Sequence, residues 1–557
     1  MSILGGSDIG VRPRRAYWDR QQVPMSAAKV SAGLGPARYP RIMEISRRRM
    51  LGSSALIAAG LGIAGGSGSA VMAASNGRQP TPSTGRVWRS SNGVLNGTLT
   101  MQTGTAQVAG NPLAGISTYN GAFSGPTMIV RPGDRLDLTL QNRIDTPSNL
   151  HFHGFHVSPR GHGDNVFLDI PPGYDFRYSV QIPADHPSGL YWYHPHRHGY
   201  VNAQVYSGLQ GLIVIEGGAA DYPQVAPLRR RILNIRNIGI TNLGAGQAFV
   251  PIDQMTVTQM VTLVNGAFQP NIDMHPGETQ FWQIANTSTR SYWKLLVPGA
   301  TFQVIEEDGC PTWQTWRPDT LFMPPGKRLG VLVTAPSAPR QTALMTEAFA
   351  QNLSWSLPES TLASVTVSGP RRDSVTLPEV MAPSPKYLEG PVAERRVLTL
   401  GATTRTPLPP DFWFDNVPYQ NITLENVITV RVGTTEDWIL KNTNVAPFSA
   451  LVENHPFHIH VNPFWVVDHG EFDPATGAIL TRTKSYPRAE LDTLNIAPGE
   501  WVRIRIHFAD YVGRTVFHCH VLGHEDLGMM GVIDIVDADG NGAGVGQLLP
   551  TQTGHSH

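Results

Sequence analysis

Four pairs of histidines, each pair separated by one residue, stand out in this sequence of 557 residues. On a β-strand, residues two apart point to the same side, so both imidazoles of a pair can reach one metal ion. On a helix they would diverge by about 200°. One such pair could be two hydrogen-bonded histidines of a half-exposed strand, but four pairs favour a metal cluster. The pairs are His151 and His153, His194 and His196, His458 and His460, and His518 and His520.

The last pair surrounds one of the two cysteines, in the stretch VFHCHVLGHEDLGMM (516–530). Because side chains alternate along a strand, Cys519 points away from its two neighbours, and one strand can serve two metal sites. Two imidazoles, a thiolate and a distant thioether are the set typical of blue copper. The chain offers this set as His455, Cys519, His524 and Met529. The eight paired histidines then remain for three further copper ions, two held by three imidazoles each and one by two.

The composition limits what kind of protein carries these residues. Lys+Arg and Asp+Glu both number 43, and no basic run in the body of the chain indicates a nucleic-acid partner. The 56 glycines and 45 prolines imply many turns, which favour short strands over long helices. Two cysteines cannot form a disulfide framework, so stability must come from packed sandwiches.

Three similar segments predict three domains. PTMIVRPGDRLDLTLQN (126–142) and PNIDMHPGETQFWQIAN (270–286) share a central Pro-Gly and a final Asn, and NVITVRVGTTEDWILKN (426–442) keeps the Gly and the Asn nine residues apart. Each segment alternates apolar and polar residues around a turn, as half-buried antiparallel strands do. The expected divisions are an N-terminal extension (1–74), three β-domains (86–225, 226–390 and 391–540) and a tail (541–557).

The N-terminal extension has the layout of an export signal. A basic cluster, Arg47 to Arg49, is followed by a Gly/Ala-rich apolar run and then by small residues. The paired arginines resemble the twin-arginine type, and the apolar run is too short and too rich in glycine to span a bilayer comfortably. We therefore expect the twin-arginine machinery to export the chain to the periplasm or the medium, with cleavage near Ala73 or Ala74 and no stable membrane anchor.

These motifs together resemble the multicopper oxidases, the laccase-like family of three cupredoxin domains. The resemblance covers nearly all of the mature chain and rests on all four copper motifs of the family, intact and in order. It implies an all-β fold of three consecutive cupredoxin-like Greek-key β-sandwiches, with a copper cluster between domains one and three and the second domain as a spacer. It assigns His455, Cys519, His524 and Met529 to a type 1 copper, His151 and His458 to a type 2 copper, and His153, His194, His196, His460, His518 and His520 to a type 3 pair.

The resemblance also implies a reaction. Four copper ions would accept single electrons from a reductant near the His524 edge and reduce dioxygen to water, which consumes four protons. Acids near the cluster are therefore expected. Asp164 matches an acidic position that follows the first motif in laccase-like relatives. Glu525 matches a carboxylate linked to proton delivery in some bacterial members, with Asp526 as its rival. Each of these acids also has a simpler interpretation as a turn residue or a solvated charge.

The electron donor stays open at the level of sequence. Phenols or aromatic amines are the first expectation, while bilirubin-like pigments and reduced metal ions, cuprous ion among them, are alternatives. A different class of function is an exported copper-binding or structural protein without turnover. The presence of all ten histidines, Cys519 and Met529 argues against that class.

Overall fold

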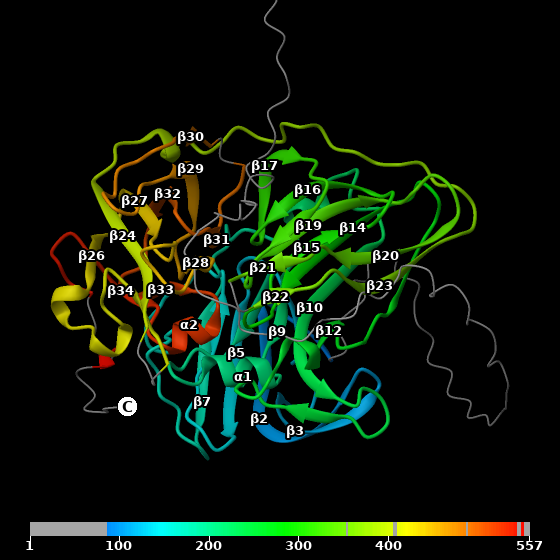
Figure 1. Ribbon diagram of the computed structural model, residues 1–557, viewed down its shortest axis with the longest axis horizontal. Coiled ribbons are helices and arrows are strands. Elements are labelled where there is room, and N and C mark those ends of the chain that lie inside the picture. Colours follow the sequence, from blue (N-terminus) through cyan, green and yellow to red (C-terminus); the bar gives the residue numbers. More distant parts are fainter. Residues whose placement is uncertain (1–85, 353–354, 405–408, 486–487, 543–546, 551–557) are drawn as a thin grey trace, which may run out of the picture. The chain divides into compact units, whose positions relative to one another are not determined.

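The computed structural model describes residues 86–352, 355–404, 409–485, 488–542 and 547–550 (Figure 1). Strands dominate these residues, and they form three β-sandwiches in succession along the chain. This confirms the predicted all-β fold. The export signal expected before residue 75 lies outside the described residues. Of the helices that the structure describes, none is long and apolar enough to cross a membrane.

The first sandwich packs a five-stranded sheet on a four-stranded sheet around an apolar core that includes Leu138, Phe152 and Ile213. The five-stranded sheet contains, in spatial order, β1 (Val87–Arg89), β4 (Thr127–Val130), β9 (Gly211–Ile215), β8 (Leu190–His194) and β6 (His151–His153). The four-stranded sheet contains β3 (Asn111–Tyr119), β2 (Val94–Val108), β5 (Arg135–Arg143) and β7 (Asp175–Gln181).

The second sandwich has a core that includes Trp282, Trp293 and Val331. Its larger sheet runs β11 (Ala248–Val250), β10 (Arg230–Thr241), β14 (Thr279–Asn286), β19 (Arg328–Thr334), β16 (Thr301–Glu307) and β17 (Cys310–Trp316), with β12 (Met260–Val264) also paired to β10. Its smaller sheet runs β13 (Asn271–Met274), β23 (Ser360–Val367), β20 (Arg340–Thr346), β15 (Trp293–Leu296) and β18 (Leu321–Met323). A short hairpin, β21 (Phe349–Ala350) and β22 (Ser356–Leu357), follows β20.

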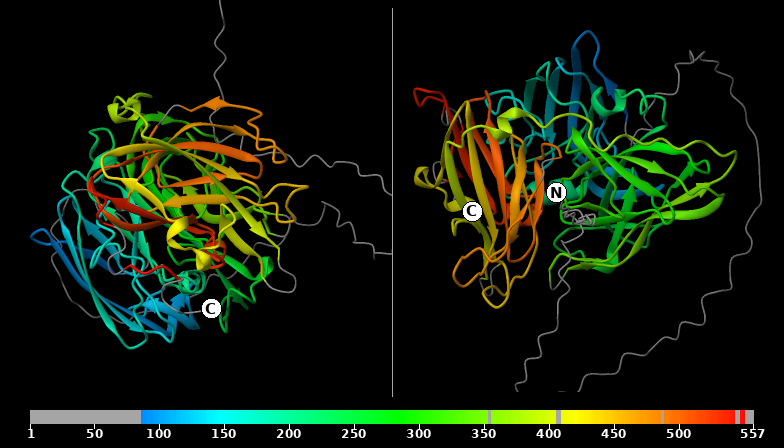
Figure 2. Two further views of the ribbon diagram at one scale, coloured as in Figure 1. Left: turned by 90° about the vertical axis from the view of Figure 1, so that its left-hand side faces the viewer. Right: turned by 90° about the horizontal axis from the view of Figure 1, so that it is seen from above.

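The third sandwich carries most of the candidate ligands, and Figure 2 shows its yellow-to-red strands stacked as two layers. One sheet runs β25 (Asp411–Phe414), β24 (Glu394–Thr403), β27 (Thr434–Asn442), β32 (Glu500–Phe508), β29 (Phe464–Glu471) and β30 (Thr483–Lys484). The other runs β26 (Ile428–Arg431), β34 (Met530–Val536), β33 (Gly513–Cys519), β28 (His455–Ile459) and β31 (Thr493–Ile496). In the part of the chain that the structure describes, the 3-10 turns are η2 (Gly218–Asp221), η3 (Val257–Gln259), η4 (Lys386–Glu389), η5 (Tyr419–Asn421) and η6 (Leu424–Asn426).

The three repeated segments fold in the same way. In each, the chain leaves one sheet, turns at a glycine with positive φ and enters the other sheet, where its strand pairs in parallel with an earlier strand. The asparagine that ends each repeat is buried, and its side-chain amide donates to two backbone carbonyls. In each repeat, the glycine therefore forms the turn between the two sheets, and the asparagine fixes the adjoining loops by hydrogen bonds. The glycines are Gly133, Gly277 and Gly433, and the asparagines are Asn142, Asn286 and Asn442.

Two short helices lie where the domains meet, beside the strands that carry the paired histidines. Helix α1 (Val201–Ser207) follows β8, and helix α2 (Leu522–Asp526) follows β33 (Figure 1). An apolar cluster at their contact takes Trp192 from the first sandwich, Ile232 from the second and Leu522 from the third. Burial of this shared surface draws the ends of β8 and β33 together.

Candidate metal centre

A trigonal set of ligands lies buried in the third sandwich. His455 begins β28, Cys519 ends β33, and His524 lies in α2. The Sγ atom of Cys519 is 3.6 Å from Nδ1 of His455 and 3.6 Å from Nδ1 of His524. These three ligand atoms can therefore share one ion. Met529 is fully buried, its N–H donates to the His524 carbonyl at 2.8 Å, and its own carbonyl accepts from the Cys519 N–H at 3.0 Å.

The outer edge of this set is formed by side chains that the sequence motifs did not reveal. The ring of Phe412 stacks on His524 with centroids 3.9 Å apart. Nε2 of His524 lies 3.2 Å from Oε2 of Glu453, and the amide of Asn352, from the second sandwich, donates to the same oxygen at 2.9 Å. Burial acts to raise the pKa of Glu453, but His524, His455 and the hydrogen bond from Asn352 together outweigh it and lower that pKa to about 2. The carboxylate is therefore an anion beside His524.

The eight paired histidines converge where the first and third sandwiches meet. Register pairs His151 with His194 across β6 and β8, and His458 with His518 across β28 and β33. Ligand atoms within 4.8 Å of one another form several groups of three that draw on both sandwiches, and His151, His153 and His458 make one of them. Two further groups share no residue with each other and together include six histidines. One triad is His153, His194 and His520, and the other is His196, His460 and His518. His151 and His458 remain, with ring centroids 6.0 Å apart.

The nitrogen atoms of these rings suit metal ions. Nε2 of His518 lies 3.1 Å from Nε2 of His196 and 3.2 Å from Nε2 of His460, as expected of ligands around one ion. Nε2 of His151, His194 and His458 has no hydrogen-bond partner among the described residues, although each ring binds an acceptor through Nδ1. Burial lowers the pKa of His151, and it lowers that of His194 to about 3, which favours the neutral form that binds metal. The donor set fits copper.

The two expected acids both contact the histidine cluster. The carboxylate of Asp164 lies 2.9 Å from Nδ1 of His151, and burial raises its pKa to about 8. Glu525 lies 3.0 Å from Nδ1 of His518 and 3.4 Å from Nδ1 of His196, and burial raises its pKa to about 7. Each acid can therefore hold a proton beside a histidine near neutral pH.

Asp526, the rival of Glu525, points elsewhere. Its carboxylate accepts hydrogen bonds from the backbone N–H groups of Gly199, Val201 and Asn202, at 2.8, 3.2 and 2.8 Å. These groups lie at the start of helix α1, so Asp526 fastens α2 to α1. It contacts none of the candidate ligands through these bonds.

A charged residue that sequence reasoning missed lies between the cluster and the second sandwich. Asp492 precedes β31, its Oδ1 lies 3.2 Å from Nε2 of His153, and its backbone carbonyl accepts from Nδ1 of His458 at 2.8 Å. Arg328 of β19 binds both carboxylate oxygens of Asp492. No spacing in the sequence relates Arg328 to Asp492, because the two residues come from different domains.

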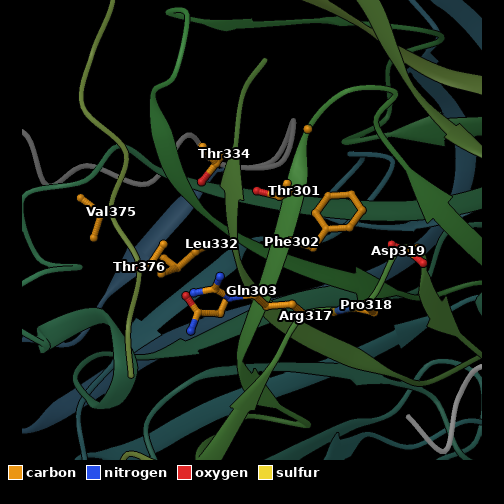
Figure 3. Close-up of a pocket in the computed structure, with 11 residues that line it drawn as sticks. Thr301, Phe302, Gln303, Arg317, Pro318, Asp319, Leu332, Thr334, Val375 and Thr376 are labelled. Carbon is orange, nitrogen blue, oxygen red and sulfur yellow. The ribbon is translucent and has the colours of Figure 1, made fainter. Parts of the chain in front are cut away.

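The hollow drawn in Figure 3 is separate from this centre. It measures about 210 Å³ and is lined by residues of the second sandwich, among them Thr301, Arg317 and Val375. None of the candidate ligands lines it. The chemistry therefore belongs to the buried cluster rather than to this hollow.

Comparisons with known proteins agree with this geometry. Three family models described as multicopper oxidase match residues 100–220, 243–365 and 395–539, more than half of the chain. A multicopper oxidase of Staphylococcus haemolyticus is 24% identical over 451 residues, covering 81% of this chain and 90% of its own length. The laccase of Bacillus subtilis is 24% identical over 487 residues, covering 75% of this chain and 90% of its own.

A solved structure shares the fold. The multicopper oxidase of Campylobacter jejuni, described as a metallo-oxidase, superimposes with a TM-score of 0.66 at 24% identity and covers 81% of this chain and 94% of its own. The matched family models span all three sandwiches, including the first and the third, which hold the ligand sets. This chain belongs to the multicopper oxidase family.

Proposed function

We propose that this multicopper oxidase removes single electrons from a phenol or an aromatic amine and delivers them to dioxygen, which is reduced to water. The observation that supports the proposal is the tripeptide of His518, Cys519 and His520, which contributes to both the trigonal set and the histidine cluster. Its covalent bonds form a short path between the two. Bound copper supplies the one-electron chemistry and the site where dioxygen is reduced.

The residues that would hold copper follow the family pattern. The trigonal set, with Met529 as the distant thioether, would hold type 1 copper, and His151 with His458 would hold type 2 copper. The two triads described above would each hold one ion of the type 3 pair. Neutral imidazoles and a thiolate suit copper at all of these positions.

Asp164 and Glu525 would hold the protons that water formation requires. Each carboxyl is buried against an imidazole of the cluster, where bulk water does not supply protons directly. A positioned acid of this kind typically contributes about 10²–10⁴-fold to a rate. Asp526 has no such role in this proposal, because its carboxylate caps the start of α1.

The donor would deliver its electron at the His524 edge. The side chain of His524 is 9% exposed, and that of Glu453 beside it is 3% exposed. A phenol loses a proton when it is oxidised, and the anionic Glu453 carboxylate would accept a hydrogen bond from the phenolic O–H while that proton leaves to water. The pairing of His524 with Glu453 thus supports a phenolic donor.

The same carboxylate favours a second candidate function, the oxidation of a reduced metal ion such as cuprous or ferrous ion. An anion beside His524 attracts a cation, and the similar protein from Campylobacter jejuni is described as a metallo-oxidase. Glu453→Gln separates the two candidates. For a phenol we expect kcat to fall while a donor that releases no proton is unaffected, whereas a metal-ion oxidase would instead show a raised KM for the cation.

Oxygen uptake by the copper-loaded mature chain tests the oxidase reaction itself. We expect four molecules of a phenolic donor to be oxidised per dioxygen, without peroxide. A blue, fully loaded protein that consumes no dioxygen with phenols, aromatic amines, cuprous ion or ferrous ion would favour the non-catalytic copper-binding alternative.

We also propose that the chain reaches the periplasm or the medium through the twin-arginine pathway. The proposal is supported by the arginine cluster 47–49 and the apolar run that follows it. Replacing Arg47 and Arg48 by lysine should leave the full-length protein in the cytoplasmic fraction, while the native chain is recovered in shortened form outside it. Equal export of both chains would contradict the proposal.

A further inference from the structure

A turn of the second sandwich, residues 324–328, forms part of the wall of the histidine cluster. Gly326 in this turn has a φ of 87°, and a Cβ at this position would lie 2.9 Å from Cδ2 of His520. A side chain here would therefore displace the imidazole, and its backbone would be strained. The second domain, expected to act as a spacer, also reaches the cluster.

Arg328, at the end of this turn, connects all three domains. Its side chain is fully buried, and its Nη1 and Nη2 atoms donate to the two carboxylate oxygens of Asp492 at 2.7 and 2.6 Å. Nε donates to the carbonyl of Leu190 in the first sandwich at 3.2 Å, and Nη2 donates to the carbonyl of Asp308 in the second at 2.8 Å. Such a planar fork fixes the carboxylate in orientation as well as in position.

Asp492 in turn binds two candidate copper ligands. Its Oδ1 lies 3.2 Å from Nε2 of His153, and its backbone carbonyl accepts from Nδ1 of His458 at 2.8 Å. The opposite nitrogens then face the cluster, since Nδ1 of His153 lies 3.3 Å from Nε2 of His520. A hydrogen bond to one nitrogen of an imidazole determines which nitrogen stays free for a metal.

Asp308 provides a second contact from the same domain. Its Oδ2 accepts from the backbone N–H groups of Asp492 and Thr493, each at 3.2 Å, and from Nζ of Lys327 at 3.0 Å. Lys327 also donates to the carbonyl of Thr493 at 3.2 Å and pairs with Glu307 at 2.6 Å. The second sandwich therefore holds Asp492 by its side chain, through Arg328, and holds the backbone of residues 492–493 through Asp308 and Lys327.

We propose that Arg328 and Asp308 are positioning residues that hold Asp492 and thereby fix the orientation and tautomer of His153 and His458. The inference rests on the proposed function, because it assumes that these two histidines bind copper. The second domain would then position two ligands of the metal centre through Arg328 and Asp308. A buried ion pair is weak evidence for stability alone, because apolar residues of similar volume often replace such pairs without loss.

The test compares two buried arginines. Arg328→Lys keeps the charge but loses the fork, and Arg328→Met removes both. The matched control is Arg514→Met, since Arg514 also forms a buried, two-point pair, with Asp534 at 2.7 and 2.8 Å. Unlike Asp492, Asp534 forms no hydrogen bond with a candidate ligand among the described residues. The measurements are copper content, the blue absorbance of the type 1 site and the electron paramagnetic resonance spectrum of type 2 copper, all on the resting full-length protein.

We expect both Arg328 variants to keep the blue absorbance and to change the type 2 spectrum, with affinity for copper in the cluster lowered by roughly 10–100-fold. Arg514→Met should leave the spectrum unchanged. If Arg328→Met does not fold, Arg328→Lys alone decides. Four bound coppers with a native type 2 spectrum in Arg328→Lys would overturn the proposal. Because no donor is added, an inactive oxidase would contradict the proposed function without affecting this result.

Discussion

His518 and Cys519 are adjacent in the chain, yet their side chains contact different ligand sets. Nε2 of His518 lies 3.1 Å from Nε2 of His196, whereas Sγ of Cys519 lies 3.6 Å from Nδ1 of His455. Alternation of side chains along β33 produces this division. The two sets can therefore be removed separately by mutation.

Cys519→Ser should abolish the blue absorbance and turnover while the histidine cluster still binds copper. A serine hydroxyl cannot replace the thiolate that gives the trigonal set its affinity for copper. Absorbance and copper content of the purified variant are the measurements. Retention of the blue colour would show that another residue provides the sulfur ligand.

His458→Ala should keep the blue absorbance and stop dioxygen reduction. The ring of His458 belongs to the histidine cluster and is not part of the trigonal set of His455, Cys519 and His524. Because a ligand itself is lost, the fall in activity should exceed the roughly 10–100-fold typical when an outer partner of a ligand is lost. Full oxidase activity in this variant would refute the cluster assignment.

Asp164→Asn should slow turnover by about 10²-fold or more. The effect should be largest from neutral pH up to about 8, where protons from water are scarce and the native carboxyl still holds its proton, and smaller in acid. The amide still fits beside Nδ1 of His151 but cannot donate a proton as a carboxylic acid does. Asp169→Asn is the matched control, because Asp169 has an exposed side chain that pairs with Arg197. An unchanged pH profile in Asp164→Asn would return this acid to a structural role.

Asn286→Ala should destabilise the fold by roughly 2–4 kcal/mol, because buried groups lose their hydrogen bonds. The amide of Asn286 donates to the carbonyls of Ser291 and Met323, and its oxygen accepts from the Ser288 N–H. Thermal unfolding is the measurement. Asn271→Ala, at an exposed position in the same domain, should change the melting temperature little.

His156→Gln should destabilise the chain at low pH more than at high pH. Burial acts to lower the pKa of His156, but hydrogen bonds to Asp510 (2.9 Å) and to the Val461 carbonyl (2.8 Å) together outweigh it, so the pKa is raised. The stabilisation is therefore complete below the unfolded-state pKa of about 6.5 and is lost as pH rises through the raised folded-state pKa. The measurement is the melting temperature of the native and variant chains from about pH 5 to about pH 9, a range that includes the unfolded-state pKa. A difference that grows with pH would contradict it.

Much of the fold followed from local patterns. The repeated glycine and asparagine predicted three homologous β-domains, since a turn needs the positive φ of glycine and a buried amide must satisfy its hydrogen bonds nearby. Apolar alternation predicted the strands around those turns. The two short helices had no comparable pattern, because their buried apolar side chains pack at the junction of the domains.

For the metal centre, the sequence by itself determined the types of ligand, their pairing on strands and the opposite directions of Cys519 and its neighbours, because these follow from side-chain chemistry and strand geometry. Only the tertiary structure decided how six histidines divide into two triads, since each triad combines both outer sandwiches. It also decided that Glu525 faces the cluster while Asp526 caps α1, and that Arg328 holds Asp492. Contacts between residues far apart in the chain depend on how the domains dock, and no local spacing encodes that.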